Sequence, residues 1–597
     1  MPWGEKRTVV EQYNHAAITI TEQNNLHRIV IVHFKVFDDG VGFRYEFPKQ
    51  QNMADVYITE ENTYFNMDGE NNTFWIPGDW DIYEHLYTNS KLKNIDATTY
   101  RGANLAQTSI PNNAVSTPVT MITQKGTHIS LHEADLTDYS GMTLKLTDTK
   151  DGFVSCLVGS DNHKYKVLQH VPFVTPWRTI QISPNAGGLI ESDLIVNLND
   201  PALTDDVSWF TPMKYIGIWW DMHLNRRTWD YASGNHGATT EYTKELIDFA
   251  ADHNIGGVLV EGWNTGWEHW VGFEEREGVF DFVTPYPDYN LKEVVRYGKE
   301  KGVELIMHHE TSAATATYTQ QLDTAYRLME SLGIHAVKTG YVGKILPKGE
   351  YHHGQYMVNH YQQVLEAGLE HHVAINAHEH IKATGKRRTY PNAIAREGLR
   401  GQEFNAWAED GGNPPNHLPT VAFARMLAGP IDFTPGIFNM KLNPYRPNNQ
   451  INTTLAQQLA LYVVIYSPVQ MAADLISNYE GNPAFQFIED VAVDWEQSKV
   501  LNGEVGQYVT IARQARDDKS WFVGGITNEK SREMALSFDF LEEGKDYEAI
   551  LYSDAKDAHW NDNPEAYSID TITLSKSTVL DVYLAPGGGF AMEILGL

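Results

Sequence analysis

Carboxylates follow several short apolar runs in the middle of the chain. Within residues 371–404 one run leads to Glu379 and the next is followed by Glu397 and Glu403, while an earlier run leads to Glu310. Where such runs alternate with helical patterns, the strands are parallel, and the side chains at their carboxyl ends gather at one edge. The sequence therefore predicts a group of glutamates at one end of a barrel.

Crowded glutamates repel one another, which raises their pKa values unless a cation neutralises them. A protonated carboxyl can give a proton to a leaving oxygen, and an ionised one can take a proton from water. Glycoside hydrolysis needs this division of labour. A hard cation such as calcium could gather several of these carboxylates. The alternative is that they, and Glu261 after another run, are ordinary surface charges.

Histidines accompany these glutamates. His308 and His309 precede Glu310, and His378 precedes Glu379. Zinc accepts both ligand types, but neither segment has the HExxH spacing of zinc hydrolases, so contacts to sugar hydroxyls are the favoured interpretation. The sequence also has no GxSxG motif, and its one cysteine lies far from these residues, which argues against serine and cysteine hydrolases.

The elements that must position these residues lie between about residues 214 and 475. Eight short apolar runs are the expected strands: 215–220, 256–261, 303–308, 334–339, 373–377, 390–394, 431–434 and 469–473. Helical patterns separate most of them: 239–253, 290–301, 317–332, 355–371, 418–429 and 453–466. This count and length predict a (β/α)8 TIM barrel. The alternative, a doubly wound sheet, lacks a Gly-rich dinucleotide motif here.

Alternating strand patterns flank this region on both sides. We predict a β-sandwich over residues 1–207, the catalytic barrel over 208–485 and an antiparallel β-domain over 486–597. The expected fold class is thus multidomain, α/β plus all-β.

The amino-acid composition limits which classes of binding partner are expected. The chain has 46 basic and 77 acidic residues and a formal charge of -31, which disfavours binding to nucleic acid. No apolar run approaches ~20 residues, so no membrane span is expected. Twelve per cent of the residues are aromatic, which suits stacking on sugars as well as large β-rich cores.

Several segments together resemble glycoside hydrolase family 97, over nearly the whole chain: VFDDGVGFRYEFP, GIWWDMH, MHHETSA, VKTGYVG, INAHE and RTYPNAIAREGLRGQE. The resemblance implies an N-terminal β-super-sandwich, a (β/α)8 barrel and a C-terminal β-domain. It implies that Glu403 is the general acid and that Glu379 and Glu310 activate water. It also implies a Ca2+ ion held by Glu379, Glu397, Glu403 and an N-terminal glutamate, which we match to Glu61.

One position divides the two branches of this family. Retaining members, typically α-galactosidases, resemble one another in an Asp nucleophile after the fourth strand, where this chain has Lys338-Thr339-Gly340-Tyr341. The resemblance therefore implies the inverting branch, an exo-acting, calcium-dependent α-glucosidase on starch-derived maltooligosaccharides. The expected sugar contacts and pocket wall are His308, His309, His378, Trp219, Trp220, Tyr83 and Glu84.

Two alternatives stay open: an α-galactosidase of the same family, and a carbohydrate-binding protein without turnover. We expect a monomer or homodimer. The family resemblance also implies that the chain begins inside its N-terminal domain, without the first strands. MPWGEKRTVVEQYN has no apolar signal region, so a leader would precede it if the natural full-length protein is periplasmic or secreted, as expected.

Overall fold

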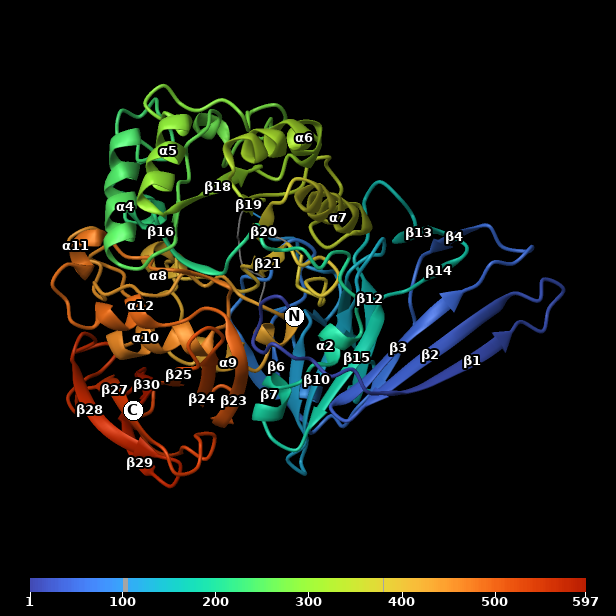
Figure 1. Cartoon of the computed structure of the whole chain (residues 1–597). Helices are drawn as coiled ribbons and strands as arrows, with labels where there is room; N and C mark the ends of the chain where they lie inside the picture. Colours follow the sequence, from blue (N-terminus) through green and yellow to red (C-terminus); the bar gives the residue numbers. More distant parts are fainter. Residues whose placement is uncertain (100–105, 380) are drawn as a thin grey trace.

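A computed structural model describes residues 1–99, 106–379 and 381–597. Three parts follow one another along the chain: β-sheets drawn in blue and cyan, a barrel in green to orange, and a β-sheet in red (Figure 1). Within the described residues, no helix is both long enough and apolar enough to cross a bilayer.

The central barrel is built on a seven-stranded parallel sheet in the order β21-β20-β19-β18-β17-β16-β22. Its strands are β16 Met213–Gly217, β17 Gly257–Leu259, β18 Glu304–Glu310, β19 Ala336–Gly340, β20 Ala374–Ala377, β21 Ala393–Arg396 and β22 Val469–Met471. Every residue of five of these strands is buried, and so is every residue of β18 except Glu304 at its start, because helices cover the sheet. With its flanking β-domains, this barrel confirms the predicted fold class.

The barrel helices are α3 Trp219–His223, α4 Thr240–Asp252, α5 Leu291–Lys301, α6 Thr315–Leu332, α7 Gln355–Glu370, α8 Phe404–Trp407, α9 His417–Val421, α10 Leu455–Val464, α11 Ile476–Tyr479 and α12 Phe485–Asp490. Five of them, α4 to α7 and α10, begin and end close to predicted patterns, and the others were not predicted as such. Thr239 caps α4, as its side chain accepts a hydrogen bond from the Tyr242 amide. The pattern predicted as one helix over 418–429 is instead α9 followed by a 3-10 turn, Arg425–Ala428.

Two predicted strands were placed imperfectly. The run 431–434 forms only a single parallel bridge, between Ile431 and Arg396, although the Asp432 amide donates to the Arg396 carbonyl and so closes that side of the barrel. The run 390–394 was predicted too early, because residues before Ala393 form turns and β21 starts there. Apolar composition alone does not separate a strand from the buried turn beside it.

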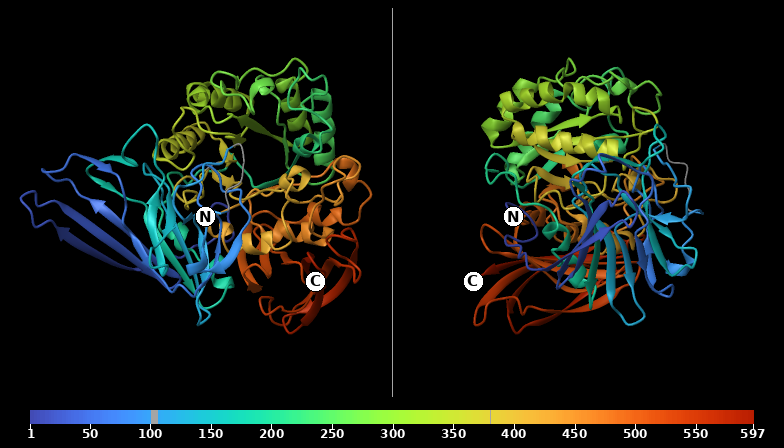
Figure 2. Two further views of the ribbon diagram at one scale, coloured as in Figure 1. Left: turned by 180° about the vertical axis from the view of Figure 1, so that it is seen from behind. Right: turned by 90° about the vertical axis from the view of Figure 1, so that its right-hand side faces the viewer.

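The N-terminal part is a β-sandwich with small additions. A nine-stranded sheet has the order β1-β2-β3-β15-β10-β9-β6-β7, with β14 on β3, beside a four-stranded sheet, β5-β12-β11-β8, and the pair β13-β4. The bounds are β1 Asn14–Thr21, β2 Ile29–Phe37, β3 Gly40–Phe47, β4 Asp55–Ile58, β5 Tyr64–Asn66, β6 Asn72–Trp75, β7 Thr88–Lys91, β8 Ala114–Val115, β9 Val119–Ile122, β10 His128–Ala134, β11 Met142–Leu146, β12 Gly152–Leu157, β13 Val167–His170, β14 Phe173–Val174 and β15 Trp177–Ser183. Figure 2 shows β1 to β3 reaching away from the barrel. Two short helices, α1 Gly187–Ile190 and α2 Leu194–Asn197, lead to the barrel.

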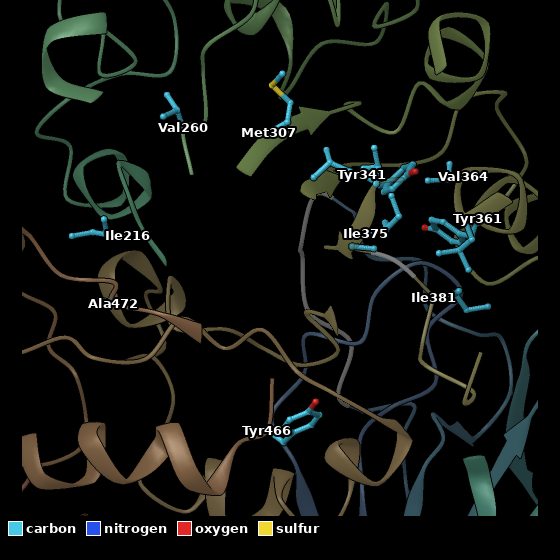
Figure 3. Close-up of a cluster of buried hydrophobic side chains, with 14 of the residues drawn as sticks. Ile216, Val260, Met307, Tyr341, Tyr361, Val364, Ile375, Ile381, Tyr466 and Ala472 are labelled. Carbon is cyan, nitrogen blue, oxygen red and sulfur yellow. The ribbon is translucent and has the colours of Figure 1, made fainter. Parts of the chain in front are cut away.

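The C-terminal part is an antiparallel sheet, β23-β24-β25-β30-β27-β28, with a separate pair, β26-β29. Its strands are β23 Trp495–Glu504, β24 Tyr508–Ala515, β25 Trp521–Thr527, β26 Arg532–Ser537, β27 Asp546–Asp554, β28 Tyr567–Ser575, β29 Val579–Leu584 and β30 Gly589–Gly596. Helix α10 packs on this sheet, so its whole circumference is buried. Around the barrel, one cluster of buried side chains reaches from Ile216 to Tyr361 and Ile381 (Figure 3).

Candidate active site

Strand β18 delivers two side chains to the barrel mouth. Because side chains alternate along a strand, His308 and Glu310 line a cavity, whereas His309 between them faces the helices and contacts the Tyr318 hydroxyl at 3.0 Å. The Glu310 carboxylate accepts hydrogen bonds from the Ser312 amide at 2.6 Å and the Val342 amide at 3.2 Å. Burial, together with the charge of Glu379, nevertheless raises the pKa of Glu310 well above its usual range.

Glu379 follows β20 in a left-handed backbone conformation, with φ at 50°. This conformation is uncommon for residues other than glycine. Its Oε2 accepts a hydrogen bond from the Tyr341 amide at 2.9 Å, and its own amide donates to Glu397 Oε2 at 3.1 Å. Burial and the charge of Glu397 raise the pKa of Glu379 to about 8. Two carboxylates are thereby held together through backbone groups.

Glu397, Glu403 and Glu84 form the other side of the carboxylate group. Glu397 lies just after β21 and Glu403 just before α8, while Glu84 comes from the N-terminal sandwich. One oxygen of each lies within 4.8 Å of the others. Burial and the charge of Glu397 raise the pKa of Glu403 to about 7 and that of Glu84 well above its usual range. We name Glu84, Glu310, Glu379, Glu397 and Glu403 the carboxylate cluster.

This donor set suits a hard cation. Oxygens of Glu84, Glu397 and Glu403 converge, and a second group joins His378, Glu379 and Glu397 within the same 4.8 Å limit. Burial and the charge of Glu397 raise the pKa values of Glu379 and Glu403 even though His378 and Lys338 oppose this shift, so a cation bound here would favour the ionised carboxylates. Oxygen ligands with excess negative charge are typical of calcium sites rather than of zinc sites.

Charged pairs flank the cluster. Lys338 on β19 lies with its Nζ 3.1 Å from Glu261 Oε1, and both side chains are buried. His378 Nε2 lies 2.9 Å from Asp432 Oδ2 and its Nδ1 lies 3.6 Å from Glu397 Oε1. Burial opposes protonation of His378, but the two carboxylates outweigh it and raise its pKa to about 10. These pairs present fixed charges and hydrogen-bonding groups to the cavity.

The cavity has a volume of about 340 Å³ and opens at the carboxyl ends of the strands. Four tryptophans, Trp219, Trp229, Trp267 and Trp270, line it, and Trp407 is another lining residue at its edge, with 43% of its surface exposed. The Trp267 ring stacks on His308 with ring centres 5.6 Å apart. Aromatic faces beside polar groups suit a sugar, whose rings have apolar faces and hydroxyl edges.

Most of the sequence-predicted residues meet at this cavity. The structure brings Glu310, Glu379, Glu397, Glu403, Glu84, His308, His378 and Trp219 to its lining. Tyr83 lies just behind it, and its hydroxyl donates to Glu397 Oε2 at 3.2 Å. Trp220 does not line the cavity but stacks on Trp219 with ring centres 5.2 Å apart. His309 is also outside the lining, so its expected sugar contact is not supported.

Glu61 is the clearest misplacement, because it lies inside the N-terminal sandwich. Arg178 holds both of its carboxylate oxygens, Nε to Oε1 at 2.8 Å and Nη2 to Oε2 at 2.5 Å. The Tyr139 and Thr63 hydroxyls donate to it as well. The structure does not bring Glu61 to the carboxylate cluster. The sandwich glutamate there is Glu84, in the aromatic segment that also supplies Tyr83.

Sequence reasoning missed several lining or supporting residues. In the sequence, Lys338 stands out only as the absence of a carboxylate after the fourth strand, although it lines the cavity, and Asp432 is the second residue of the predicted strand 431–434. Asp432 accepts hydrogen bonds from the Tyr215 hydroxyl and from Asn376 Nδ2. The tryptophans of residues 263–270 stand after the second strand, and this position was the available signal.

Solved structures place the chain in a family. It superposes with a TM-score of 0.93 on a glycoside hydrolase family 97 enzyme from Pseudoalteromonas sp. strain K8, solved in complex with acarbose. The two are 44% identical over 100% of this chain and 90% of that chain. A variant of the same enzyme, solved with panose, matches equally well. The chain belongs to glycoside hydrolase family 97.

Sequence comparisons agree with this membership. Family models match three segments: "Glycosyl-hydrolase 97 N-terminal" residues 1–201, "Glycoside hydrolase 97" residues 219–399, and "Glycosyl-hydrolase 97 C-terminal, oligomerisation" residues 494–595. A retaining alpha-galactosidase of Bacteroides thetaiotaomicron is 26% identical over 600 residues, 94% of this chain and 83% of that protein. The protein is thus a glycoside hydrolase, and the cavity at its barrel mouth is the candidate active site.

Proposed function

We propose that this family 97 enzyme is an inverting, exo-acting α-glucosidase that hydrolyses maltooligosaccharides. The observation that carries the proposal is the end of β19. A Cβ added at Gly340 would lie 2.0 Å from Glu310 Oε2 and 3.5 Å from Glu379 Oε2. The family resemblance implies that retaining members have their nucleophile after this strand, whereas here Glu310 fills that space and leaves none for another carboxylate.

The proposed division of labour follows from the cluster. Glu403, whose pKa is raised to about 7 in the absence of a bound cation, would protonate the leaving oxygen. Glu310 and Glu379 border the same small space above Gly340, so they would hold water and accept its proton. The Lys338–Glu261 pair and His378 would bind the hydroxyls of the terminal sugar.

We further propose that calcium is held by Glu84, Glu379, Glu397 and Glu403, with Glu84 in place of the Glu61 assigned from the sequence. When bound, calcium would neutralise these carboxylates and stabilise negative charge beside the substrate. The convergence of their oxygens supports this assignment. Glu379 would then be ionised at neutral pH, as its role as a base requires.

The choice of glucose rests on the relatives. The solved enzyme that is 44% identical was crystallised with acarbose and with panose, whereas the curated galactosidase is 26% identical. The second candidate, an α-galactosidase, is favoured by that relative's name alone, and the Gly340 geometry argues against its retaining mechanism.

Proton NMR of early maltose hydrolysis tests the proposal. β-Glucose should form first, in calcium but not in chelator. α-Glucose forming first would overturn inversion, and equal rates in chelator would overturn the calcium assignment. Faster cleavage of an aryl α-galactoside than of the matching α-glucoside would replace the glucosidase by the galactosidase. Saturable binding of maltooligosaccharides without product would indicate a binding protein instead.

A further inference from the structure

A row of four buried charges crosses from the sandwich to the barrel. Glu61 pairs with Arg178, Arg178 Nη1 lies 2.6 Å from Glu133 Oε2, and Glu133 Oε1 lies 2.8 Å from Lys382 Nζ. At most 6% of any of these side chains is exposed. The charges alternate and cancel, so the row is neutral as a whole.

Lys382 is the barrel end of this row, three residues after Glu379. Its ammonium donates to the Thr117 hydroxyl at 2.5 Å and to the Met142 carbonyl, besides its pairing with Glu133. All three partners belong to the N-terminal sandwich. A lysine ammonium has three donors, and each of the three has an acceptor here.

The backbone around Lys382 depends on the sandwich too. Between Ile381 and Thr384, where every residue is described, the chain forms neither helix nor strand. The Ala383 carbonyl faces His132 Nε2 at 2.8 Å, and the Thr384 carbonyl accepts from the Asp135 amide at 2.9 Å. Ile381 is itself buried in the core that Figure 3 shows. The sandwich thus fixes residues 381–384, which follow Glu379 closely in the chain.

Glu379 needs such support because its left-handed backbone conformation is unfavourable for a residue other than glycine and persists only where the surrounding structure imposes it. Before Glu379 in the chain, strand β20 constrains the backbone. After it, residues 381–384 do so, because Lys382 anchors them to the sandwich. Buried ion pairs contribute little net stability relative to apolar residues of the same size. A role in fixing one conformation accounts for the row better than a role in stability.

We propose that Lys382 is a positioning residue for Glu379: through Glu133 and Arg178 the sandwich sets where the water-activating carboxylate stands. The inference rests on the role proposed above for Glu379. The nine-stranded sheet of the sandwich would then help to position a catalytic group without contacting the substrate.

The test is Lys382→Met, alone and with Glu133→Gln so that the buried charges stay balanced. The control is Lys166→Met, which removes a surface pair with Glu60 in the same sandwich. Well below the melting temperature, kcat of the folded fraction should fall about tenfold or more, with KM within about twofold. The loss should be equal on maltose and on α-glucosyl fluoride, because both need the base but only maltose needs the acid.

Hydrogen exchange supplies a readout that does not depend on activity. Amides of residues 374–379 and 381–386 should exchange faster in Lys382→Met, while those of 304–310 keep their wild-type rates. A lower melting temperature with unchanged kcat and unchanged exchange would overturn the proposal and leave Lys382 a purely structural residue. Inactive wild-type enzyme on all glucosides would overturn the proposed function instead, and the exchange result would still decide whether Lys382 holds the segment.

Discussion

Two buried glutamates at the same barrel mouth behave in opposite ways. Burial alone would raise both pKa values, yet Lys338 lowers that of Glu261 to about 2, whereas Glu379 beside Glu397 is raised to about 8. Residue type and burial are the same, so the neighbour decides. Glu261 therefore stays ionised and suits the binding of sugar hydroxyls, whereas Glu379 can titrate and suits proton transfer.

The largest effect should come from removing the acid of the cluster. Glu403→Gln abolishes the proton donor, and kcat on maltose should fall by about 10²–10⁴-fold. Hydrolysis of α-glucosyl fluoride, whose leaving group needs no proton, should fall far less. Glu409→Gln, at an exposed neighbouring position, is the matched control. Equal losses on both substrates would remove Glu403 from its proposed role.

Lys338→Met converts the paired glutamate into an unpaired one. A buried Glu261 without its partner should lower the free energy of unfolding by about 3–5 kcal/mol. The double variant with Glu261→Gln should recover much of that loss, because no uncompensated charge remains. Thermal unfolding of the three proteins measures this. A double variant no more stable than Lys338→Met would mean that the pair contributes by packing rather than by charge.

Chelation should expose the repulsion within the cluster. The pKa values of Glu379, about 8, and Glu403, about 7, are raised, so the folded protein keeps protons that the unfolded chain releases above the ordinary glutamate pKa of ~4.3. In chelator, the unfolding midpoint should therefore decline as pH rises from 5 to 8.5, and calcium should flatten this decline. Parallel pH profiles with and without calcium would contradict the assignment of the site.

The smallest effect is expected from removing one carboxylate of the cluster, that of Glu84. Glu84→Gln removes one of the three carboxylates whose oxygens converge, so calcium affinity should weaken about tenfold. Titration calorimetry measures the affinity, with the exposed Glu60→Gln as control. Unchanged calcium affinity in Glu84→Gln would leave the N-terminal ligand unidentified.

The order of the barrel elements and most of the site residues could be predicted from the sequence, because both depend on local patterns. Apolar runs alternating with helices predicted the barrel, and the glutamates after those runs, such as Glu310 and Glu379, do line its mouth. Strand alternation would have excluded His309 from the lining, since His308 and Glu310 take the inward positions.

What could not be predicted depends on partners far away in the chain. Glu61 and Glu84 both stand in polar, aromatic segments of the sandwich, and only the position of Arg178, 117 residues from Glu61, separates them. Likewise nothing near Lys338 indicates that it pairs with Glu261, 77 residues earlier. Tertiary pairing determines which carboxylates are neutralised, and single-sequence patterns do not contain it.

The reach of Tyr83 and Glu84 into the barrel mouth has a consequence for how such enzymes can be recombined. Tyr83 donates a hydrogen bond to Glu397, 314 residues later in the chain, and Glu84 joins the carboxylate cluster, so part of the active site is encoded in the N-terminal sandwich. A barrel transplanted onto a foreign sandwich would lose both groups together. The two parts are therefore expected to be inherited as one unit rather than exchanged as independent modules.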